Sequence, residues 1–294
     1  MNFDAILLIT ISMISTGLLF GAIFALVAAG ITIVYGSIWL PNATNGQFFL
    51  LASLGCWTLT SEFGFPVALA ALLILLASIP MSSLLEMTLV RRFYDVPDRN
   101  IAYFVMTLGL TQILAGILSI TYGRWSDQFT LPTLISGFTF IGPFPMSNNR
   151  ILVLVIAGLL LALLFSLLRF HPYGRALRAV FQNREAAALR GVNVRAIYRL
   201  SFGLGNFIIF AGGLLYGMAY SFDLTVAWTM SVTAFAIMIV GGPGSVVGAL
   251  VVGMIFGFTQ AFVSIFASPT VATFSYLGAM LLILLLKPAG LFAR

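Results

Sequence analysis

The sequence predicts an all-α, polytopic transmembrane helical bundle of about nine spans, in the range of 8–10, with the N-terminus outside and the C-terminus cytoplasmic. Three observations predict it. Of the 294 residues, 61% are hydrophobic and only 7% are charged, whereas a soluble domain carries about 25% charged residues. The mean hydropathy of the chain is +1.11. Apolar stretches of the length that crosses a hydrocarbon layer, about 20 residues, recur along the whole chain.

Nine apolar stretches are the predicted spans of a single membrane domain over residues 1–294. Helices are the expected form because backbone polar groups in lipid must bond within their own segment. The first stretch is long enough for an extra half-helix, whereas the second and the last are short for a span. The stretches cover residues 6–35, 47–61, 66–90, 101–121, 151–169, 199–220, 224–242, 245–266 and 272–287.

The basic residues predict how these spans are oriented. Cytoplasmic loops of membrane proteins carry an excess of Lys and Arg. Nine crossings place only Arg124 and Arg150 on the outer face, and the other twelve of the 14 basic residues on the cytoplasmic face. Those twelve are Arg91, Arg92, Arg99, Arg169, Arg175, Arg178, Arg184, Arg190, Arg195, Arg199, Lys287 and Arg294.

The scarcity of reactive side chains argues against several kinds of site. Cys56 is the only cysteine and His171 the only histidine, so the chain has neither an internal disulfide nor the ligands of a thiolate or histidine metal site. The only lysine, Lys287, precedes Pro288, and a phosphate-binding loop would need Gly-Lys followed by Ser or Thr. We therefore expect no catalytic residues, no metal and no cofactor in this chain, and any ATP-driven step must come from another subunit.

The predicted cytoplasmic loop, residues 171–199, is the most informative polar segment. Asn183 can cap a short helix because its side-chain oxygen can accept from free backbone N–H groups. Glu185 lies in the first turn of that helix, where the macrodipole favours an acid, and three alanines that favour helix follow it. Gly191 is typical of the residue just past a helix end. Two turns of helix are not stable alone, so packing or a partner must hold them.

This loop resembles the EAA loop of ABC-importer membrane subunits, in which Glu-Ala-Ala and three further residues precede a Gly. The string GRALRAVFQNREAAALRGVNV, residues 174–194, is similar to the loop of the branched-chain amino acid permeases. Residues 201–204 depart from the general EAA consensus in the way that this subgroup does. Residues 36–46, GGPGS at 241–245 and KPAGLF at 287–292 are also similar to that subgroup.

The resemblance implies the transmembrane permease subunit of an ATP-binding-cassette importer, which translocates branched-chain or other hydrophobic amino acids across the inner membrane. It implies a second, homologous permease subunit, two cytoplasmic ATPase subunits that hold ATP and Mg, an extracytoplasmic solute-binding protein, and no nucleic acid. Relatives are associated with urea, short amides or aromatic acids, so these substrates remain alternatives. The residues implied to couple to the ATPase are Arg184, Glu185, Ala186, Ala187, Ala188 and Gly191.

Polar residues in or beside the spans are candidates for the substrate path. Residues 41–47 read Pro-Asn-Ala-Thr-Asn-Gly-Gln, which suggests a broken backbone that dips inward, as at the transport sites of discontinuous helices. The similar family usually has Asn-Phe-Ala-His-Gly-Glu here, so a titratable patch has become neutral amide. The alternative for residues 41–47 is an ordinary polar turn. The alternative for the two isolated glutamines is a structural hydrogen bond to a neighbouring helix. The candidates are Asn42, Asn45, Gln47, Gln112 and Gln260.

Two further segments contain many turn residues. Gly241, Gly242 and Gly244 surround Pro243 and predict a tight turn, which is either a hinge near the ATPase or a plain connection between two spans. The outer segment 122–150 is the longest predicted non-cytoplasmic loop. It is expected to fold over the outer mouth, to meet an external partner, or to be a solvated connector.

Two other classes of protein agree less well with the sequence. An ion-coupled secondary transporter would need acids buried in the middle of the membrane, and no predicted span has one at its centre. A membrane-embedded enzyme would need a clustered nucleophile and base, or a set of metal ligands. The carboxylates here are scattered along the chain.

Overall fold

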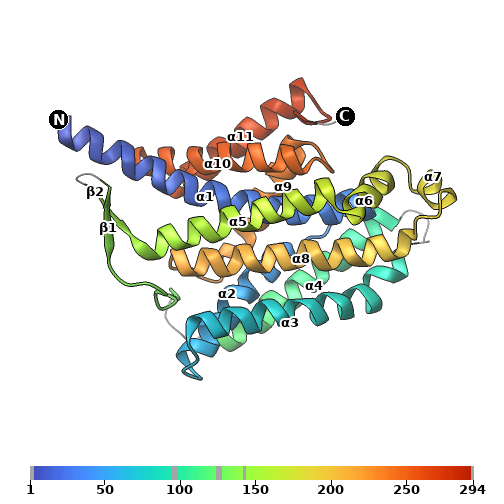
Figure 1. The fold of residues 1–294 in the computed structure, drawn as a ribbon, viewed down its shortest axis with the longest axis horizontal. Helices are drawn as coiled ribbons and strands as arrows, with labels where there is room; N and C mark the ends of the chain where they lie inside the picture. The colour runs from blue at the N-terminus through green and yellow to red at the C-terminus, as the bar shows by residue number, and fades with distance from the viewer. Residues whose placement is uncertain (1–2, 95–98, 124–127, 142–143, 293–294) are drawn as a thin grey trace.

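The computed structural model describes residues 3–94, 99–123, 128–141 and 144–292, and helices running along its long axis dominate the fold (Figure 1). Each predicted apolar stretch forms a helix. These helices are α1 (Phe3–Ile38), α2 (Asn45–Ser61), α3 (Val67–Thr88), α4 (Arg99–Tyr122), α5 (Asn148–Phe170), α8 (Val194–Ala219), α9 (Val226–Gly241), α10 (Val246–Phe266) and α11 (Pro269–Leu286).

Within the described ranges, seven helices are long and apolar enough to cross a membrane, so the chain is a multi-pass membrane protein. The expectation of about nine full spans is corrected by the two short apolar helices, α2 with 17 residues and α9 with 16. At 1.5 Å per residue each is only about 25 Å long. The last helix, α11, was expected to be short but has 18 residues and is long enough.

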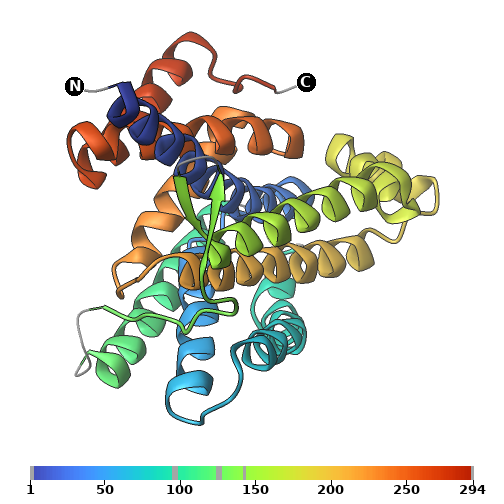
Figure 2. The same ribbon diagram turned by 60° about the vertical axis from the view of Figure 1, so that its left-hand side comes forward.

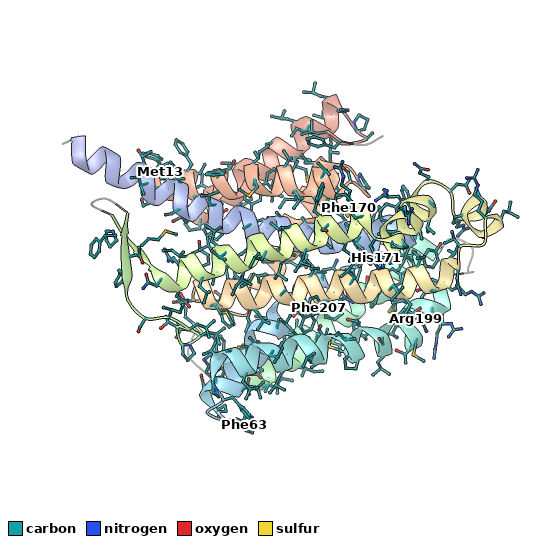
Figure 3. All side chains as sticks on the ribbon, in the orientation of Figure 1. Met13, Phe63, Phe170, His171, Arg199 and Phe207 are labelled. Carbon is teal, nitrogen blue, oxygen red and sulfur yellow. The ribbon has the colours of Figure 1, made fainter. Side chains whose placement is uncertain are left out.

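Short polar elements gather at one end of the bundle. The 3₁₀ helix η1 (Val90–Phe93) and the helices α6 (Pro172–Gln182) and α7 (Arg184–Leu189) lie there with the C-terminal tail, and the N-terminus lies at the opposite end (Figure 1). Figure 2 shows α6 and α7 projecting past the ends of α5 and α8. We call this the α7 end. His171 and Arg199 lie towards it and Phe63 towards the other end (Figure 3).

A short β-hairpin lies at the opposite end of the protein, whose fold is otherwise helical as predicted. The strands β1 (Phe138–Ile141) and β2 (Phe144–Ser147) pair antiparallel, with Thr139 opposite Met146. Aromatic and β-branched residues favour strands, but no strand was predicted in the outer segment 122–150. The hairpin end is tied to the bundle by Asn149, whose Nδ2 donates to the carbonyl oxygen of Met218 at 2.6 Å.

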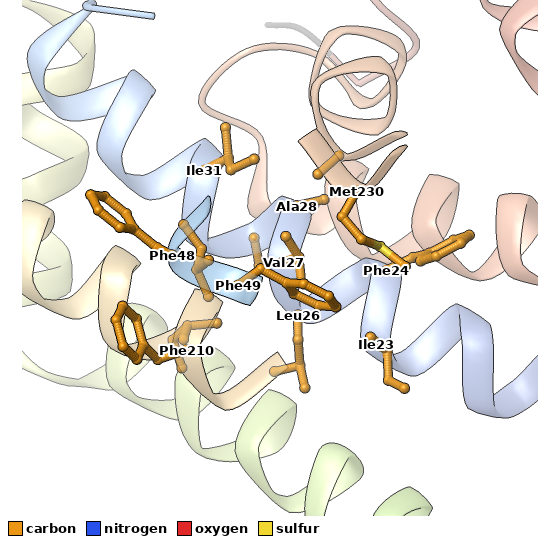
Figure 4. Close-up of a cluster of buried hydrophobic side chains, with 14 of the residues drawn as sticks. Ile23, Phe24, Leu26, Val27, Ala28, Ile31, Phe48, Phe49, Phe210 and Met230 are labelled. Carbon is orange, nitrogen blue, oxygen red and sulfur yellow. The ribbon is translucent and has the colours of Figure 1, made fainter. Parts of the chain in front are cut away.

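The long helix α1 lies in the middle of the bundle. Its most apolar window is 89% buried, whereas that of α11 is 11% buried, and a helix that is hydrophobic on all sides is typically a core helix. It packs mainly against α10, α8 and α9. Figure 4 shows side chains of α1, such as Leu26 and Val27, lying among Phe49 of α2, Phe210 of α8 and Met230 of α9.

Glycines let the core helices approach closely. A β-carbon on Gly257 of α10 would lie 2.1 Å from the backbone nitrogen of Gly21 in α1. On the other side of α1, a β-carbon on Gly30 would lie 2.6 Å from the carbonyl oxygen of Gly205 in α8. Small residues at such crossings are typical of helix packing in membranes. They fix α1 between α10 and α8.

Candidate functional site

The short helix α7 begins with a side-chain cap. The Oδ1 of Asn183 accepts from the backbone N–H groups of Glu185, at 2.9 Å, and Ala186, at 3.0 Å. A helix start leaves its first N–H groups without partners inside the helix, and this cap satisfies two of them. The expected role of Asn183 agrees with this geometry.

The end of α7 is closed by a glycine in the left-handed region. Gly191 has φ +83°, and its N–H donates to the carbonyl oxygen of Ala188 at 2.9 Å. The N–H of Val192 donates to the carbonyl oxygen of Ala187 at 3.1 Å. These two bonds form a Schellman motif, so Gly191 ends the helix as the sequence predicts. A helix of six residues is thus fixed at both ends by local hydrogen bonds.

Most residues of α7 are exposed on the surface of the chain. Of the six candidate coupling residues, only Ala187 is buried against the bundle, and the others are exposed. Leu189, at the end of the helix, is 91% exposed. An apolar side chain this exposed, beside the small side chains of Ala186 and Ala188, is a surface that a groove on another protein could enclose.

The neighbouring helix α6 attaches α7 to the bundle. It is amphipathic, and its residues Leu177 and Val180 are buried. The Tyr173 hydroxyl lies 2.9 Å from Oγ of Ser201 in α8. Burial raises the pKa of Tyr173 to about 12, so the hydroxyl, which is protonated at neutral pH in any case, keeps its proton to higher pH than an exposed tyrosine does.

Residues 41–47 lie at a break between α1 and α2, inside the protein. Oδ1 of Asn42 accepts from the Thr44 N–H at 3.0 Å. The Asn45 Nδ2 donates to the carbonyl oxygen of Asn42 at 2.7 Å. This polar turn is buried, and α2 begins directly after it at the level of the first turns of α9. The predicted inward dip of the backbone agrees with this arrangement.

Several buried amides have atoms without hydrogen bonds within the described part of the chain. Among the candidates these are Oδ1 of Asn45, Oε1 of Gln47 and Oε1 of Gln260. Both amide atoms of Asn206 in α8 are also unpaired, although that side chain is 0% exposed. Buried polar atoms normally have partners. Asn206 was not a candidate for the path, and the only sequence signal for it is a lone amide in an apolar span.

The structure does not bring all path candidates together. Gln260 is buried on α10, whereas Gln112 is exposed on α4. Gly109 and Gly116 lie one turn before and after Gln112 on the same face, and nothing lies within 4 Å of a β-carbon placed on either. This exposed stripe on α4 is defined by Gly109, Gln112 and Gly116.

The glycine turn between α9 and α10 is closely packed. Gly242 and Gly244 have φ values of +94° and +83°, which glycine adopts without strain. A β-carbon on Gly241 would lie 2.6 Å from the carbonyl carbon of Gly248. The N–H of Leu291 donates to the carbonyl oxygen of Val240 at 2.7 Å, so the C-terminal tail is attached to this turn.

Acidic side chains do not cluster in the region that the structure describes. No three or more His, Cys, Asp or Glu residues lie close enough there to hold a metal ion. Glu86, buried near the α7 end of α3, accepts a hydrogen bond from the Tyr94 hydroxyl at 2.8 Å. That acid therefore has a neutral hydrogen-bond partner.

The sequence is similar to known membrane permeases. The family model described as the branched-chain amino acid transport system permease component matches residues 13–286. The high-affinity branched-chain amino acid transport system permease protein LivH of Escherichia coli is 25% identical over 95% of this chain and 94% of its own length. BraD of Pseudomonas aeruginosa, named for the same system, is 27% identical over the same shares.

A more distant relative and a solved structure have also been found. The fructose import permease protein FrcC of Rhizobium meliloti is 29% identical over 80% of this chain and 65% of its own length. The solved structure of PsaBC from Streptococcus pneumoniae in complex with Fab has 12% sequence identity to this chain and a TM-score of 0.46. That alignment covers 92% of this chain and 91% of the other.

Proposed function

We propose that this chain moves branched-chain or other hydrophobic amino acids across the inner membrane. It belongs to the branched-chain amino acid transport permease family and is the non-catalytic membrane subunit of an ABC importer. The observation that carries the proposal is α7. It is a short helix held at both ends by local bonds and exposed on its outer side.

In this proposal α7 seats in a cleft of a cytoplasmic ATPase subunit. The exposed Leu189 and the small Ala186 and Ala188 supply an apolar contact that permits close approach. Arg184 and Glu185 flank it with charge at the start of the helix. The Schellman bonds of Gly191 preorganise the helix, which reduces the ordering cost of docking. The ATPase binds ATP and Mg, and α7 of this chain receives the motion of the ATPase.

The α7 end is proposed to face the cytoplasm. Exposed arginines of α6, α7 and the start of α8 gather there, among them Arg175, Arg184, Arg190 and Arg199. Arg150 lies at the opposite end. Such a bias of basic residues is typical of cytoplasmic loops. The opposite end, with the hairpin, would then meet an extracytoplasmic solute-binding protein.

The exposed stripe on α4 is proposed to face a second, homologous permease subunit across the solute path. Gln112 makes no hydrogen bond to any residue that the structure describes. An amide left unpaired in lipid costs several kcal/mol, so protein or water opposite this face is favoured over lipid. The open glycines on either side leave room for a solute or a closely packed helix.

The substrate class is supported by relatives that match over 95% of this chain and are named for branched-chain amino acids. The interior offers neutral amides rather than a fixed charge at residues 42–47. This is compatible with a zwitterion that has an apolar side chain, and also with urea, short amides or aromatic acids. An uptake assay with competing solutes distinguishes these substrates.

The test is ATP-driven uptake by the complete complex in proteoliposomes, with its binding protein outside. Radiolabelled leucine is the probe, and valine, phenylalanine, urea and acetamide are competitors. We expect ATP-dependent leucine uptake that valine competes for. Uptake of urea or acetamide instead would replace the substrate class, and absence of any ATP dependence would overturn the importer assignment.

A substitution on α7 tests the docking surface directly. Ala188 is exposed, so Ala188→Trp should leave the bundle folded but prevent α7 from seating. We expect loss of co-purification with the ATPase. Ser136→Trp, at the exposed opposite end, is the matched control and should keep the ATPase bound. Full ATPase binding by the Ala188→Trp complex would remove α7 from the docking surface.

A further inference from the structure

Phe181 on the last turn of α6 is half-buried and lies two residues before the cap of α7. Its ring is directed at two glycines of other segments. A β-carbon on Gly36 would lie 2.8 Å from Cζ of Phe181 and 2.9 Å from Cε2. A β-carbon on Gly244 would lie 3.6 Å from Cδ2 of the same ring. The ring therefore lies against Gly36, and between the ring and Gly244 there is room for one β-carbon.

Gly36 and Gly244 form a single depression, which we call the glycine notch. A β-carbon on Gly36 would lie 3.0 Å from the α-carbon of Gly244, so the two backbones are in contact. Gly36 belongs to the last turns of α1, and Gly244 to the turn between α9 and α10. The ring of Phe181 therefore packs on the core helix at Gly36, and Gly36 in turn contacts this turn at Gly244.

The turn beyond the notch is attached to further segments. A β-carbon on Gly290 of the C-terminal tail would lie 2.6 Å from the α-carbon of Gly242. Gly248, in the first turn of α10, lies against Gly241 at the end of α9. Any displacement of Gly244 therefore moves the junction of α9 and α10 together with the tail.

We propose that Phe181 is the positioning residue that conveys displacement of α7 to α1 and to the α9–α10 turn. The proposal rests on the proposed function, in which the ATPase moves α7. Only Asn183 separates α6 from α7, so force applied to α7 reaches the last turn of α6. Close-packed groups transmit displacement because they are nearly incompressible, and the ring in the notch is such a contact.

The geometry explains why a large, rigid side chain is needed at this position. A phenyl ring has only two side-chain torsions, so it holds its direction when it is pushed. An alanine at 181 would leave a gap between α6 and the notch, and the facing groups would lose their contact across that gap. A leucine would reach part of the way. The notch itself would remain, since its two glycines touch each other.

The experiment compares Phe181→Ala and Phe181→Leu with a matched control in the reconstituted complex. Phe170→Ala is the control, because Phe170 is 72% exposed at the end of α5. The measured quantities are ATPase co-purification, ATP hydrolysis and solute transported per ATP. We expect Phe181→Ala to keep the ATPase bound and hydrolysing while transport per ATP falls about tenfold. Phe181→Leu should lie between it and the wild type.

A second change distinguishes transmission from a merely structural role. Gly36→Ala should impair coupling on its own, because the methyl group would lie 2.8 Å from the ring of Phe181 and 3.0 Å from the α-carbon of Gly244. Combined with Phe181→Leu, the methyl group loses its collision with the ring and keeps only the approach to the Gly244 backbone, so coupling should recover above that of Gly36→Ala alone. Failure of the pair to recover, or loss of ATPase binding by Phe181→Leu, would overturn the transmission role.

Other outcomes separate this inference from the proposed function. Wild-type coupling in both Phe181 variants would overturn the inference but leave α7 docking intact. Absence of ATP-dependent uptake in the wild-type complex would overturn the proposed function itself. ATP-dependent uptake by the wild-type complex, measured in the same assay, shows whether the proposed function holds.

Discussion

Gly46 lies so close to Ala227 that a β-carbon on Gly46 would be 1.9 Å from the carbonyl oxygen of Ala227. The Gly46 N–H also donates to Oγ of Ser231 at 2.9 Å. This contact joins the starts of the two short apolar helices, α2 and α9, inside the bundle. The polar turn at residues 41–44 is therefore held against α9 by backbone contact.

Gly46→Ala is expected to destabilise the protein by about 3 kcal/mol, at the upper end of overpacking costs, because backbone rather than a flexible side chain must move. Thermal unfolding in detergent measures it as a fall in melting temperature. Gly158→Ala on α5 is the control, since nothing lies within 4 Å of its β-carbon. Equal melting temperatures for the two variants would contradict the contact.

Asn183→Ala is expected to weaken α7 by about 1 kcal/mol through loss of its cap. Because the ATPase should bind only the formed helix, affinity for it should fall up to about fivefold. Titration of the ATPase onto the solubilised permease measures this change. Asn193→Ala removes a similar cap from α8, which has 26 residues and is held by the core, so it should leave the affinity almost unchanged.

Gly191→Ala tests the backbone at the end of α7 without any steric clash. Nothing lies within 4 Å of its β-carbon, but its φ is +83°, and a left-handed residue with a side chain costs about 1–2 kcal/mol. We expect weaker ATPase binding with an unchanged melting temperature of the bundle. Gly203→Ala in α8, also open to 4 Å but without a positive φ, should bind the ATPase normally. The same loss of binding in both variants would contradict backbone strain as the cause.

Gly116→Leu should block the exposed stripe on α4 without disturbing the fold of the chain, because the position is open. We expect ATP-dependent uptake to fall while stability stays within about 0.5 kcal/mol, as for most surface changes. Gln112→Leu should also reduce uptake if the amide meets solute or the second subunit. Gly158→Leu on α5 is the control for added bulk in the membrane. Normal uptake by Gly116→Leu would place the path elsewhere.

The sequence predicted local features well where one residue type satisfies a local need. Asn183 and Gly191 were expected to cap α7, and both do so through bonds within two to five residues along the chain. The nine apolar stretches were located because lipid demands helices. The strands Phe138–Ile141 and Phe144–Ser147 were missed, since strand pairing depends on how two segments match each other rather than on composition alone.

Path and packing residues were harder to predict, because they depend on contacts between distant segments. Asn206 gives no local signal that separates it from any other lone amide in a span, yet it is fully buried and unpaired. Gln112 was predicted as a path residue, but its exposure on α4 follows only from the rotation of that helix in the bundle. Gly36 and Phe181 are far apart in sequence, and nothing in either neighbourhood indicates that they touch.

The sequence by itself determined that this protein resides in a membrane, where its helices lie, and that it carries a capped helix on a polar loop. These properties depend on hydrophobicity, charge and backbone chemistry within a few residues. The tertiary structure alone decided which helix is central, which amides are buried without partners and which ring fills the glycine notch. Those outcomes depend on the close approach of segments such as α1, α6 and α9, and no local preference encodes the distance between them.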